Sequence, residues 1–308
     1  VAGCSFCLAI IGIMVFQAKL APYSTRFGLD KYVYASEDWD FRNMFAGTKI
    51  IKKYGKLAVR SVPGESAVLF FGDSNIEQYS PRVIPLALRT KGKRGVFFIA
   101  YGGCRPVPGH DRGVGYPSAE MFEAFWDCLG ENPNIDTVVI GASWFPMRFS
   151  NTETVDGFPI NSSEGWMALK KNFEKFVQDI NDRGKKVVII SNIPFDKQLD
   201  PKNLIQRTLF PPSITILKDE YIVRESLLKI NNEMFVFLKN TAEQNDAFFI
   251  DPTLFLCPNG KCRAVDIANN KIIYKDINHL TNSYVRNYIT FLDDVILNTI
   301  PAAHLTSK

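Results

Sequence analysis

The stretch from Ser66 to Asn75 constrains the fold most, because an apolar run stops abruptly at Gly72-Asp73-Ser74. Residues 67–71 have the length and composition of a buried β-strand, and residues 75–89 are compatible with a helix. A serine at such a strand–helix turn lies beside helix amides that stabilise negative charge. The pattern indicates either a nucleophilic serine or an ordinary helix cap, since Asp and Ser are both favoured N-caps.

Short apolar runs then alternate with segments of helical periodicity along the chain. The predicted strands are 67–71, 96–101, 137–140, 186–190 and 247–250, and the predicted helices include 75–89, 118–129, 165–183, 219–244 and 281–297. This alternation predicts an α/β fold, a doubly wound, mostly parallel five-stranded sheet between two helical layers. Ligands of such sheets bind at the carboxyl ends of the strands. The residues expected there are Asp73, Ser74, Gly102, Gly103, Gly141, Ala142, Ser143 and Asn192.

Four segments are expected along the chain: 1–19, 20–65, 66–300 and 301–308. Residues 2–16 carry no charge but fall short of the roughly 20 apolar residues that span a bilayer. We interpret 1–19 as the truncated end of a transmembrane helix, with a signal-peptide core or a buried helix as alternatives. The aromatic segment 20–65 is predicted to be a helical connector, 66–300 the main domain and 301–308 a tail.

Composition excludes two classes of protein. The 308 residues are 46% hydrophobic and 22% charged, which is sufficient for a packed core and atypical of disorder. The net charge is only +4, and no basic stripe with interleaved aromatic residues indicates nucleic-acid binding.

The cysteines outside the apolar N-terminal segment are Cys104, Cys128, Cys257 and Cys262. They allow three disulfide pairings, or four free thiols. The compact turn between Cys257 and Cys262 favours a bridge there, which leaves Cys104 to pair with Cys128. Bridges of this kind indicate an oxidising compartment. No histidine or cysteine pair has zinc-finger spacing, so we predict no metal ligands.

A serine hydroxyl needs a base, usually a histidine that a carboxylate orients. Of the three histidines, His110 lies in a Gly/Pro-rich loop and His304 in the C-terminal tail. Only His279 follows an acid, Asp276, by three residues just before a predicted helix. Alone, Asp276 would be interpreted as a turn residue and His279 as an exposed or capping residue. Together with Ser74 they predict a catalytic triad.

These residues carry a family resemblance. Phe71-Gly72-Asp73-Ser74 and Asp276-x-x-His279 are similar to the first and last blocks of the SGNH, or GDSL-like, hydrolase superfamily. Residues 104–106, 141–144, 256–262 and 274–281 narrow the resemblance to the periplasmic C-terminal domain of acyltransferase-family-three proteins, the bacterial O-antigen and surface-polysaccharide O-acetyltransferases. The resemblance covers about residues 60–300.

The resemblance implies a periplasmic domain joined to a transmembrane acyltransferase domain of the same chain in the bacterial inner membrane. It implies O-acetylation of sugar hydroxyls on a polysaccharide or lipopolysaccharide through an acyl-serine. Acetyl-CoA would be the donor of the full-length protein, with no cofactor bound in this segment. Two alternatives stay open: a membrane-anchored carbohydrate esterase, and a non-catalytic glycan-binding domain.

The resemblance departs from the superfamily pattern at the oxyanion hole. The superfamily has an asparagine after the third strand, in Gly-x-Asn-Asp, where this chain has Ser143-Trp144. The Ser74 amide carries over as a donor. Gly103, Ser143 and Asn75 are further expected oxyanion or substrate residues. Trp144 is expected either to pack in the core or to cover the acceptor sugar.

Overall fold

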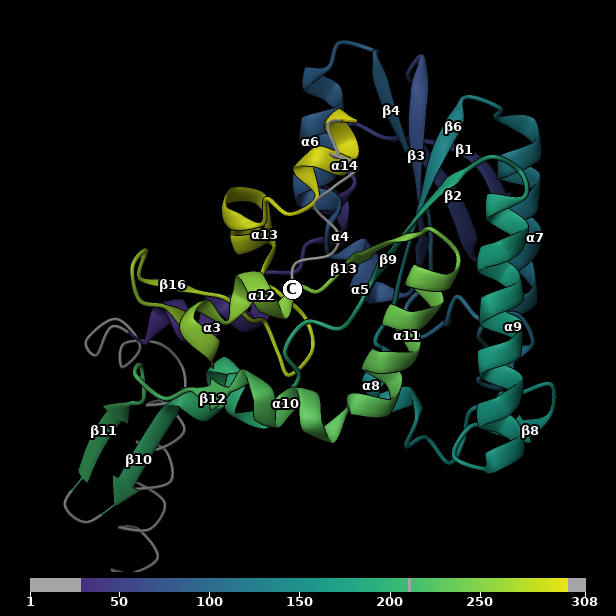
Figure 1. Cartoon of the computed structure of the whole chain (residues 1–308). Coiled ribbons are helices and arrows are strands. Elements are labelled where there is room, and N and C mark those ends of the chain that lie inside the picture. The colour runs from purple at the N-terminus through teal and green to yellow at the C-terminus, as the bar shows by residue number, and fades with distance from the viewer. Residues whose placement is uncertain (1–28, 210–211, 299–308) are drawn as a thin grey trace, which may run out of the picture.

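The structure is a computed structural model that describes residues 29–209 and 212–298 (Figure 1). The expectations for residues 1–19 and 301–308 fall outside these residues. Within the described ranges, none of the helices combines the length and the hydropathy needed to cross a membrane.

A parallel sheet forms the centre of the fold, as predicted. Its strands β3 (Ser66–Gly72), β4 (Arg94–Ala100), β6 (Ile135–Gly141), β9 (Lys186–Ile190) and β13 (Phe248–Ile250) lie in the order β4-β3-β6-β9-β13. Alternate residues of each strand point to opposite faces, and both faces are buried. In β3, Leu69 and Phe71 join one hydrophobic cluster, whereas Val68 and Phe70 join the other. The predicted α/β class is confirmed.

Two antiparallel strands extend the sheet beyond β4, so the prediction of a helical connector over 20–65 is only partly right. The described part of the connector forms α3 (Asp30–Glu37), α4 (Phe41–Met44) and then the hairpin of β1 (Lys49–Tyr54) and β2 (Leu57–Val62). The outermost strand, β1, reads Lys-Ile-Ile-Lys-Lys-Tyr and is mostly exposed. Lysines are typical of sheet edges, and they hide the alternation that identifies a strand.

Helices cover both faces of the sheet (Figure 1). One layer holds α7 (Ser118–Glu131), α9 (Ser163–Asn181) and α11 (Asn232–Gln244); the other holds α6 (Ser80–Arg89), α13 (Asn282–Tyr288) and α14 (Asp293–Leu297).

Three predicted helices are each interrupted. Residues 75–89 divide into α5 (Ser74–Glu77) and α6, which has Pro81 in its first turn, where a proline is tolerated. The segment 219–244 divides into α10 (Arg224–Ile230) and α11, and the last helix into α13 and α14.

Short elements complete the described chain. The antiparallel pair β10 (Ile205–Leu209) and β11 (Pro212–Ile216) projects from the body (Figure 1). The others are α8 (Trp144–Met147), α12 (Thr253–Leu256), β5 (His110–Asp111), β7 (Thr154–Val155), β8 (Phe158–Pro159), β12 (Ile222–Val223), β14 (Lys261–Cys262), β15 (Val265–Asp266), β16 (Lys271–Ile272) and the 3-10 turns Lys197–Leu199, Pro201–Leu204 and Pro258–Gly260.

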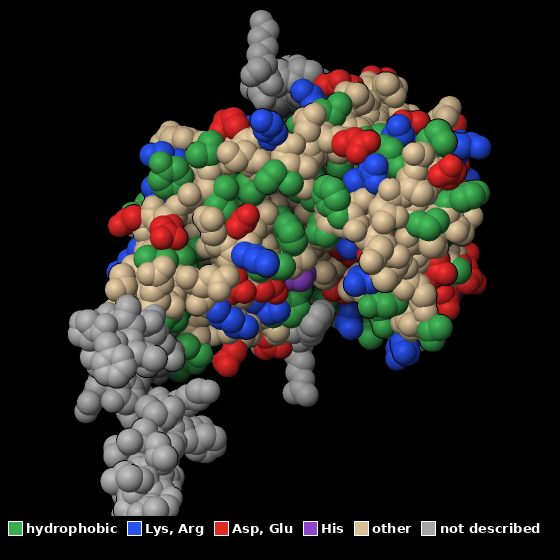
Figure 2. All heavy atoms as spheres, turned by 90° about the horizontal axis from the view of Figure 1, so that it is seen from below, with side chains coloured by type: hydrophobic (Ala, Val, Ile, Leu, Met, Phe, Trp, Pro, Cys, Tyr) green, Lys and Arg blue, Asp and Glu red, His purple; other side chains and the backbone are tan. Residues whose placement is uncertain are grey.

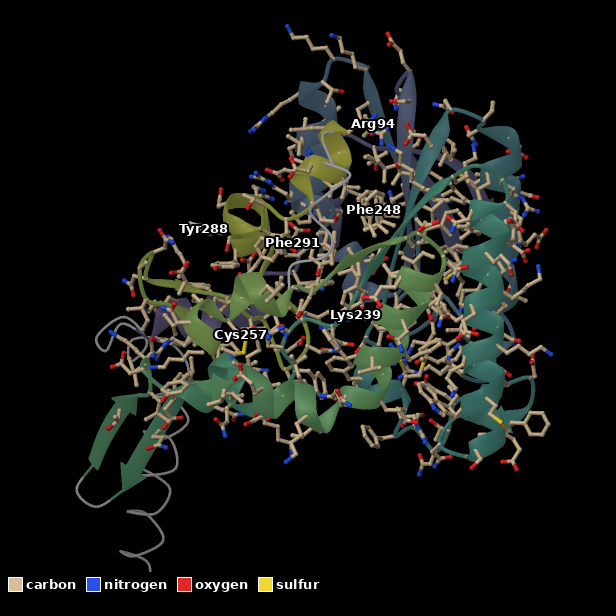
Figure 3. All side chains as sticks on the ribbon, in the orientation of Figure 1. Arg94, Lys239, Phe248, Cys257, Tyr288 and Phe291 are labelled. Atoms are coloured by element: carbon tan, nitrogen blue, oxygen red, sulfur yellow. A yellow bond between two sulfur atoms is a disulfide. The ribbon has the colours of Figure 1, made fainter. Side chains whose placement is uncertain are left out.

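One of the two predicted disulfides is present. Cys257 and Cys262 are bonded (Figure 3), whereas Cys104 and Cys128 are free and buried. Cys104 lies beside the start of α7, with its Sγ 3.9 Å from the Ser118 hydroxyl. Cys128 lies ten residues further along the same helix, a rise of about 15 Å. Disulfide-bonded residues need Cα atoms within about 7 Å, so the prediction of a Cys104–Cys128 bridge was wrong.

Candidate active site

The parallel strands end in register at one edge of the sheet. Gly72 of β3 pairs with Ala100 of β4 and Gly141 of β6, and Gly141 pairs with Ile190 of β9. A Cβ on Gly72 would lie 1.8 Å from the Gly141 carbonyl oxygen, so only glycine permits this close approach. The residues that follow these strands therefore share one edge, as predicted, and include Asp73, Ser74, Gly102, Gly103, Ser143 and Asn192.

The three residues of the predicted triad lie in hydrogen-bond contact. Ser74, the first residue of α5, has its Oγ 2.9 Å from Nε2 of His279. Nδ1 of His279 lies 2.9 Å and 3.0 Å from the two carboxylate oxygens of Asp276. The Asp276 carboxylate also accepts the backbone amides of Asn278 and His279, each at 3.0 Å. The side chains of His279 and Asp276 are 18% and 31% exposed, so solvent reaches this group.

Asp276 is charged in this arrangement. Burial raises the pKa of its carboxyl. Hydrogen bonds from His279 and the Asn278 amide, together with the nearby Lys275 charge, lower this pKa by more than burial raises it. The net effect holds the pKa of Asp276 well below its usual range. An ionised Asp276 accepts the Nδ1 proton of a neutral His279, and this tautomer leaves the Nε2 lone pair facing Ser74.

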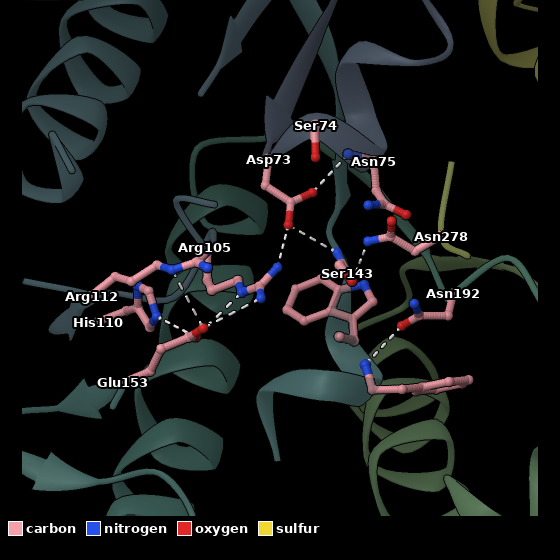
Figure 4. A network of polar contacts seen from close by, with 12 residues as sticks. Asp73, Ser74, Asn75, Arg105, His110, Arg112, Ser143, Glu153, Asn192 and Asn278 are labelled. Carbon is pink, nitrogen blue, oxygen red and sulfur yellow. Dashed lines mark hydrogen bonds and ion pairs between the residues drawn. The ribbon is translucent and has the colours of Figure 1, made fainter. Parts of the chain in front are cut away.

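A buried ion-pair network holds the turn that carries Ser74 (Figure 4). Asp73 accepts the amides of Asn75 at 2.8 Å and Ser143 at 3.0 Å, and it pairs with the Arg105 guanidinium. Arg105 also lies 3.4 Å from Glu153. Asp73 thus fixes the end of β3 against the end of β6, and Arg105 compensates its buried charge.

The network continues from Glu153 to His110, whose Nε2 is 3.0 Å from the carboxylate. Burial raises the pKa of Glu153, but the contacts with His110 and Arg105 outweigh it and bring the pKa to about 2. His110, assigned only to a Gly/Pro-rich loop from the sequence, therefore lies in this supporting network.

Gln78 connects the Ser74 turn to the His279 loop. It is fully buried; its Nε2 donates to the Asn75 carbonyl at 3.0 Å, and its Oε1 accepts the Leu280 amide at 2.9 Å. The sequence analysis missed this residue. Its one local signal is its position four residues after Ser74, one turn along the same short segment.

The expected oxyanion residues follow the strands β3, β4 and β6, and their polar groups differ in whether they already have hydrogen-bond partners. The Asn75 side chain is buried, and neither its oxygen nor its nitrogen has a hydrogen-bond partner in the described residues. The Ser143 amide is already bonded to Asp73, whereas its hydroxyl lies 3.5 Å from the Asn278 side-chain nitrogen. Gly103 is half-buried in the turn after β4, with φ of +83°. A side chain there would collide with Arg112.

Trp144 belongs to the core. Its side chain is 0% exposed, its indole Nε1 donates to the Ile190 carbonyl at 2.9 Å, and its ring packs against Phe173. Of the two expectations for this residue, core packing agrees with its position, and a fully buried side chain has no surface with which to cover a sugar.

Within residues 29–209 and 212–298, no three His, Cys, Asp or Glu side chains are grouped to hold a metal ion. Basic and acidic side chains intermingle on the face shown in Figure 2.

Comparisons with known proteins agree with the motifs. A family model described as an SGNH domain fused to AT3 domains matches residues 47–293. No curated protein matches the chain.

Solved structures resemble this fold to different degrees. The periplasmic domain of a lipopolysaccharide acetyltransferase from Salmonella ser. Paratyphi A is 11% identical with a TM-score of 0.51, over 77% of this chain and 85% of that one. The acetyl xylan esterase AlAXEase is 18% identical with a TM-score of 0.44, over 76% of this chain and 100% of that one. A GDSL-like lipase from Bacteroides thetaiotaomicron is 14% identical with a TM-score of 0.41, over 77% of this chain and 90% of that one.

At 11% identity, the likeness to the Salmonella domain shows the fold alone. The family model, by contrast, spans well over half of the sequence and includes both ends of the predicted triad. The chain therefore belongs to the family of SGNH domains that are fused to AT3 domains.

Proposed function

We propose that this chain is the periplasmic part of a membrane O-acyltransferase that acetylates sugar hydroxyls of a bacterial surface polysaccharide or lipopolysaccharide. The observation that carries the proposal is the contact of Ser74 Oγ with His279 Nε2 at 2.9 Å, backed by Asp276 on the other ring nitrogen. Membership of an SGNH family fused to AT3 domains supports an acyl-modifying enzyme with such a domain in the same chain.

The first half-reaction acylates Ser74. His279 Nε2 takes the hydroxyl proton while Oγ attacks the acetyl carbonyl of the donor. Asp276 holds the ring orientation and stabilises the imidazolium. His279 then returns the proton to the leaving group, and the acetyl group stays on Oγ.

The oxyanion of the tetrahedral intermediate needs donors close to Oγ. We assign the Ser74 amide to this role, with the Gly103 amide, the Ser143 hydroxyl and the unpartnered Asn75 side chain as additional donors. Asn75 is the strongest of the three, because its side-chain nitrogen Nδ2 is buried and has no hydrogen-bond partner in the described residues.

The second half-reaction transfers the acetyl group. His279 removes the proton of a sugar hydroxyl, the sugar oxygen attacks the acyl-serine, and Ser74 Oγ leaves and regains a proton. In the full-length protein, the membrane domain would supply the acetyl group from cytoplasmic acetyl-CoA to this domain in the periplasm.

A carbohydrate esterase is the second proposal. Its support is the solvent exposure of His279 and Asp276, since water that reaches His279 would hydrolyse the acyl-serine. A non-catalytic glycan-binding domain is the weakest alternative, because it gives no reason for the aligned Ser74, His279 and Asp276.

Intact-protein mass spectrometry after incubation with p-nitrophenyl acetate tests these proposals, with and without an oligosaccharide acceptor. The variants are Ser74→Ala and Asp276→Asn, with the exposed Asp182→Asn as the control. A gain of one acetyl group that Ser74→Ala abolishes, followed by acetylated oligosaccharide, supports the transferase. Loss of the acetyl group to water regardless of acceptor supports the esterase. Equal labelling of wild type and Ser74→Ala would contradict both.

A further inference from the structure

The connector places an aromatic ring against the histidine of the triad. Trp39, between α3 and α4, has its ring centroid 4.8 Å from that of His279, with the two planes at 66°. Aromatic rings attract one another in such tilted arrangements. Trp39 precedes residues 47–293, the part of the chain that the family model matches, so this contact comes from outside the matched domain.

The neighbouring residue fixes the connector to the segment that follows His279. The Asp38 carbonyl accepts the Asn282 amide at 3.1 Å, and its carboxylate accepts the Ser283 amide at 3.0 Å and hydroxyl at 2.5 Å. Asn282 and Ser283 are the first two residues of α13, whose free amides need external acceptors. Asp38 therefore ties the backbone at Trp39 to the helix that begins three residues after His279.

Lys275 links Trp39 to Asp276, the acid of the triad. Lys275 Nζ lies 5.1 Å from the Trp39 ring centroid and 3.3 Å from an Asp276 carboxylate oxygen. A cation over an indole face is attracted to it, so Trp39 also holds Lys275 in place beside Asp276.

We infer that Trp39 is a positioning residue for His279: its ring limits rotation of the imidazole and keeps Nδ1 on Asp276 and Nε2 on Ser74. The inference rests on the proposed function, in which His279 is the base. Because the histidine exposes part of its ring to solvent, the hydrogen bonds to Asp276 and Ser74 compete with water, and a packed ring restricts the alternatives.

Nitrogen chemical shifts of the imidazoles test this without any turnover. The 308-residue chain would be labelled with ¹⁵N, and two-bond proton–nitrogen spectra recorded at alkaline pH, where imidazole is neutral. We expect one His279 tautomer, with the proton on Nδ1, in wild type and Trp39→Phe. We expect mixed tautomers in Trp39→Ala. Trp126→Ala is the matched control, because Trp126 packs on Phe125 and Arg183 and belongs to α7.

The rate of Ser74 acylation by p-nitrophenyl acetate is the second readout. Loss of one aromatic pair predicts about a tenfold fall in Trp39→Ala, with most of the rate restored in Trp39→Phe. A single unchanged tautomer together with a wild-type rate in folded Trp39→Ala would overturn the inference. Should that variant not fold, a wild-type tautomer and rate in Trp39→Phe support the inference and mixed tautomers there contradict it. A wild type that is never acylated would contradict the proposed function, whereas the tautomer comparison would still decide the role of Trp39.

Discussion

Gln78 Oε1 accepts a hydrogen bond from the backbone amide of Leu280 at 2.9 Å, across 202 positions of sequence. Gln78 follows Ser74 by one helical turn, and Leu280 directly follows His279. The same side chain donates to the Asn75 carbonyl, so it bridges the two segments whose separation sets the Ser74–His279 distance. These two hydrogen bonds alone are sufficient for Gln78 to fix the distance between the Ser74 turn and the His279 loop.

Replacement of Gln78 by methionine keeps the side-chain volume and removes both hydrogen bonds. The Leu280 amide and the Asn75 carbonyl would then be buried without this partner, which costs about 1–3 kcal/mol for each unsatisfied group. We expect a loss of unfolding free energy of that order in urea denaturation and at least a tenfold slower acylation of Ser74. The exposed Gln198→Met should change neither, and a folded Gln78→Met enzyme with wild-type acylation would show that the bridge is dispensable.

The Glu153 carboxylate should make the fold sensitive to acid. Contacts with His110 and Arg105 bring its folded pKa to about 2, below the usual 4.5. The resulting stability is present above pH 4.5 and is lost as the pH falls toward 2. In Glu153→Gln, Arg105 loses a buried partner, so we expect a loss of about 3 kcal/mol at pH 7 and a shallower decline in acid.

Urea denaturation between pH 2.5 and 7 measures this effect. Glu233→Gln is the control, since Glu233 forms an exposed pair with Arg148 at 3.1 Å and should contribute under about 0.5 kcal/mol. Parallel pH curves for wild type and Glu153→Gln would contradict the assignment.

Glu77 should have the opposite pH dependence. Burial, with the nearby charge of Asp73, raises the pKa of this α5 residue to about 7, while Arg60 partly opposes the shift. A raised carboxyl pKa means that the folded state holds a proton that the unfolded state has released between pH 4.5 and 7. Stability therefore falls as the pH rises through this range.

Glu77→Gln mimics the protonated carboxyl and should remove this decline. We expect the variant to be more stable than wild type above pH 7, by about 3 kcal/mol, and equal to it near pH 4.5. Denaturation curves at pH 4.5, 6 and 8 measure the difference, with the exposed Glu220→Gln as the control. A variant less stable than wild type at pH 8 would mean that the Glu77 carboxylate has a favourable charged role.

The cysteines should divide into two chemical classes. The Cys257–Cys262 bridge closes a short loop, for which chain entropy predicts about 2 kcal/mol of stabilisation. We expect reductant to lower the melting temperature of wild type and to leave the Cys257→Ser/Cys262→Ser variant unchanged. Burial raises the pKa of Cys104 to about 11 and of Cys128 to about 12, so thiol reagents should modify these two only after unfolding. Rapid modification of the native protein at either would contradict their burial.

The sequence predicts the parallel strands well because each is an unbroken apolar run. Burial on both faces removes the need for polar residues, and the apolar runs that end at Phe71, Ile140 and Ile190 are followed by Gly or Ser. The first strand of the hairpin, β1, fails the same test because it is mostly exposed and carries Lys49, Lys52 and Lys53.

The site shows the same division. Ser74, Asp276 and His279 are recognisable because each lies in a local pattern that chemistry explains. Gln78, Trp39 and Glu153 contact residues that lie 202, 240 and 48 positions away in the sequence. No short window of sequence contains both members of such a pair. Cys104 and Cys128 are a further example. Pairing them by elimination ignores the length of the helix that separates them.

The 205 positions that separate Ser74 from His279 also have a consequence during synthesis. Ribosomes deliver Ser74 long before His279, and the bridge from Gln78 cannot form until Leu280 has emerged. A nascent or truncated polypeptide that stops short of residue 279 would carry a serine without a proton acceptor. In the proposed mechanism, Ser74 therefore becomes reactive only in chains that have completed their C-terminal segment.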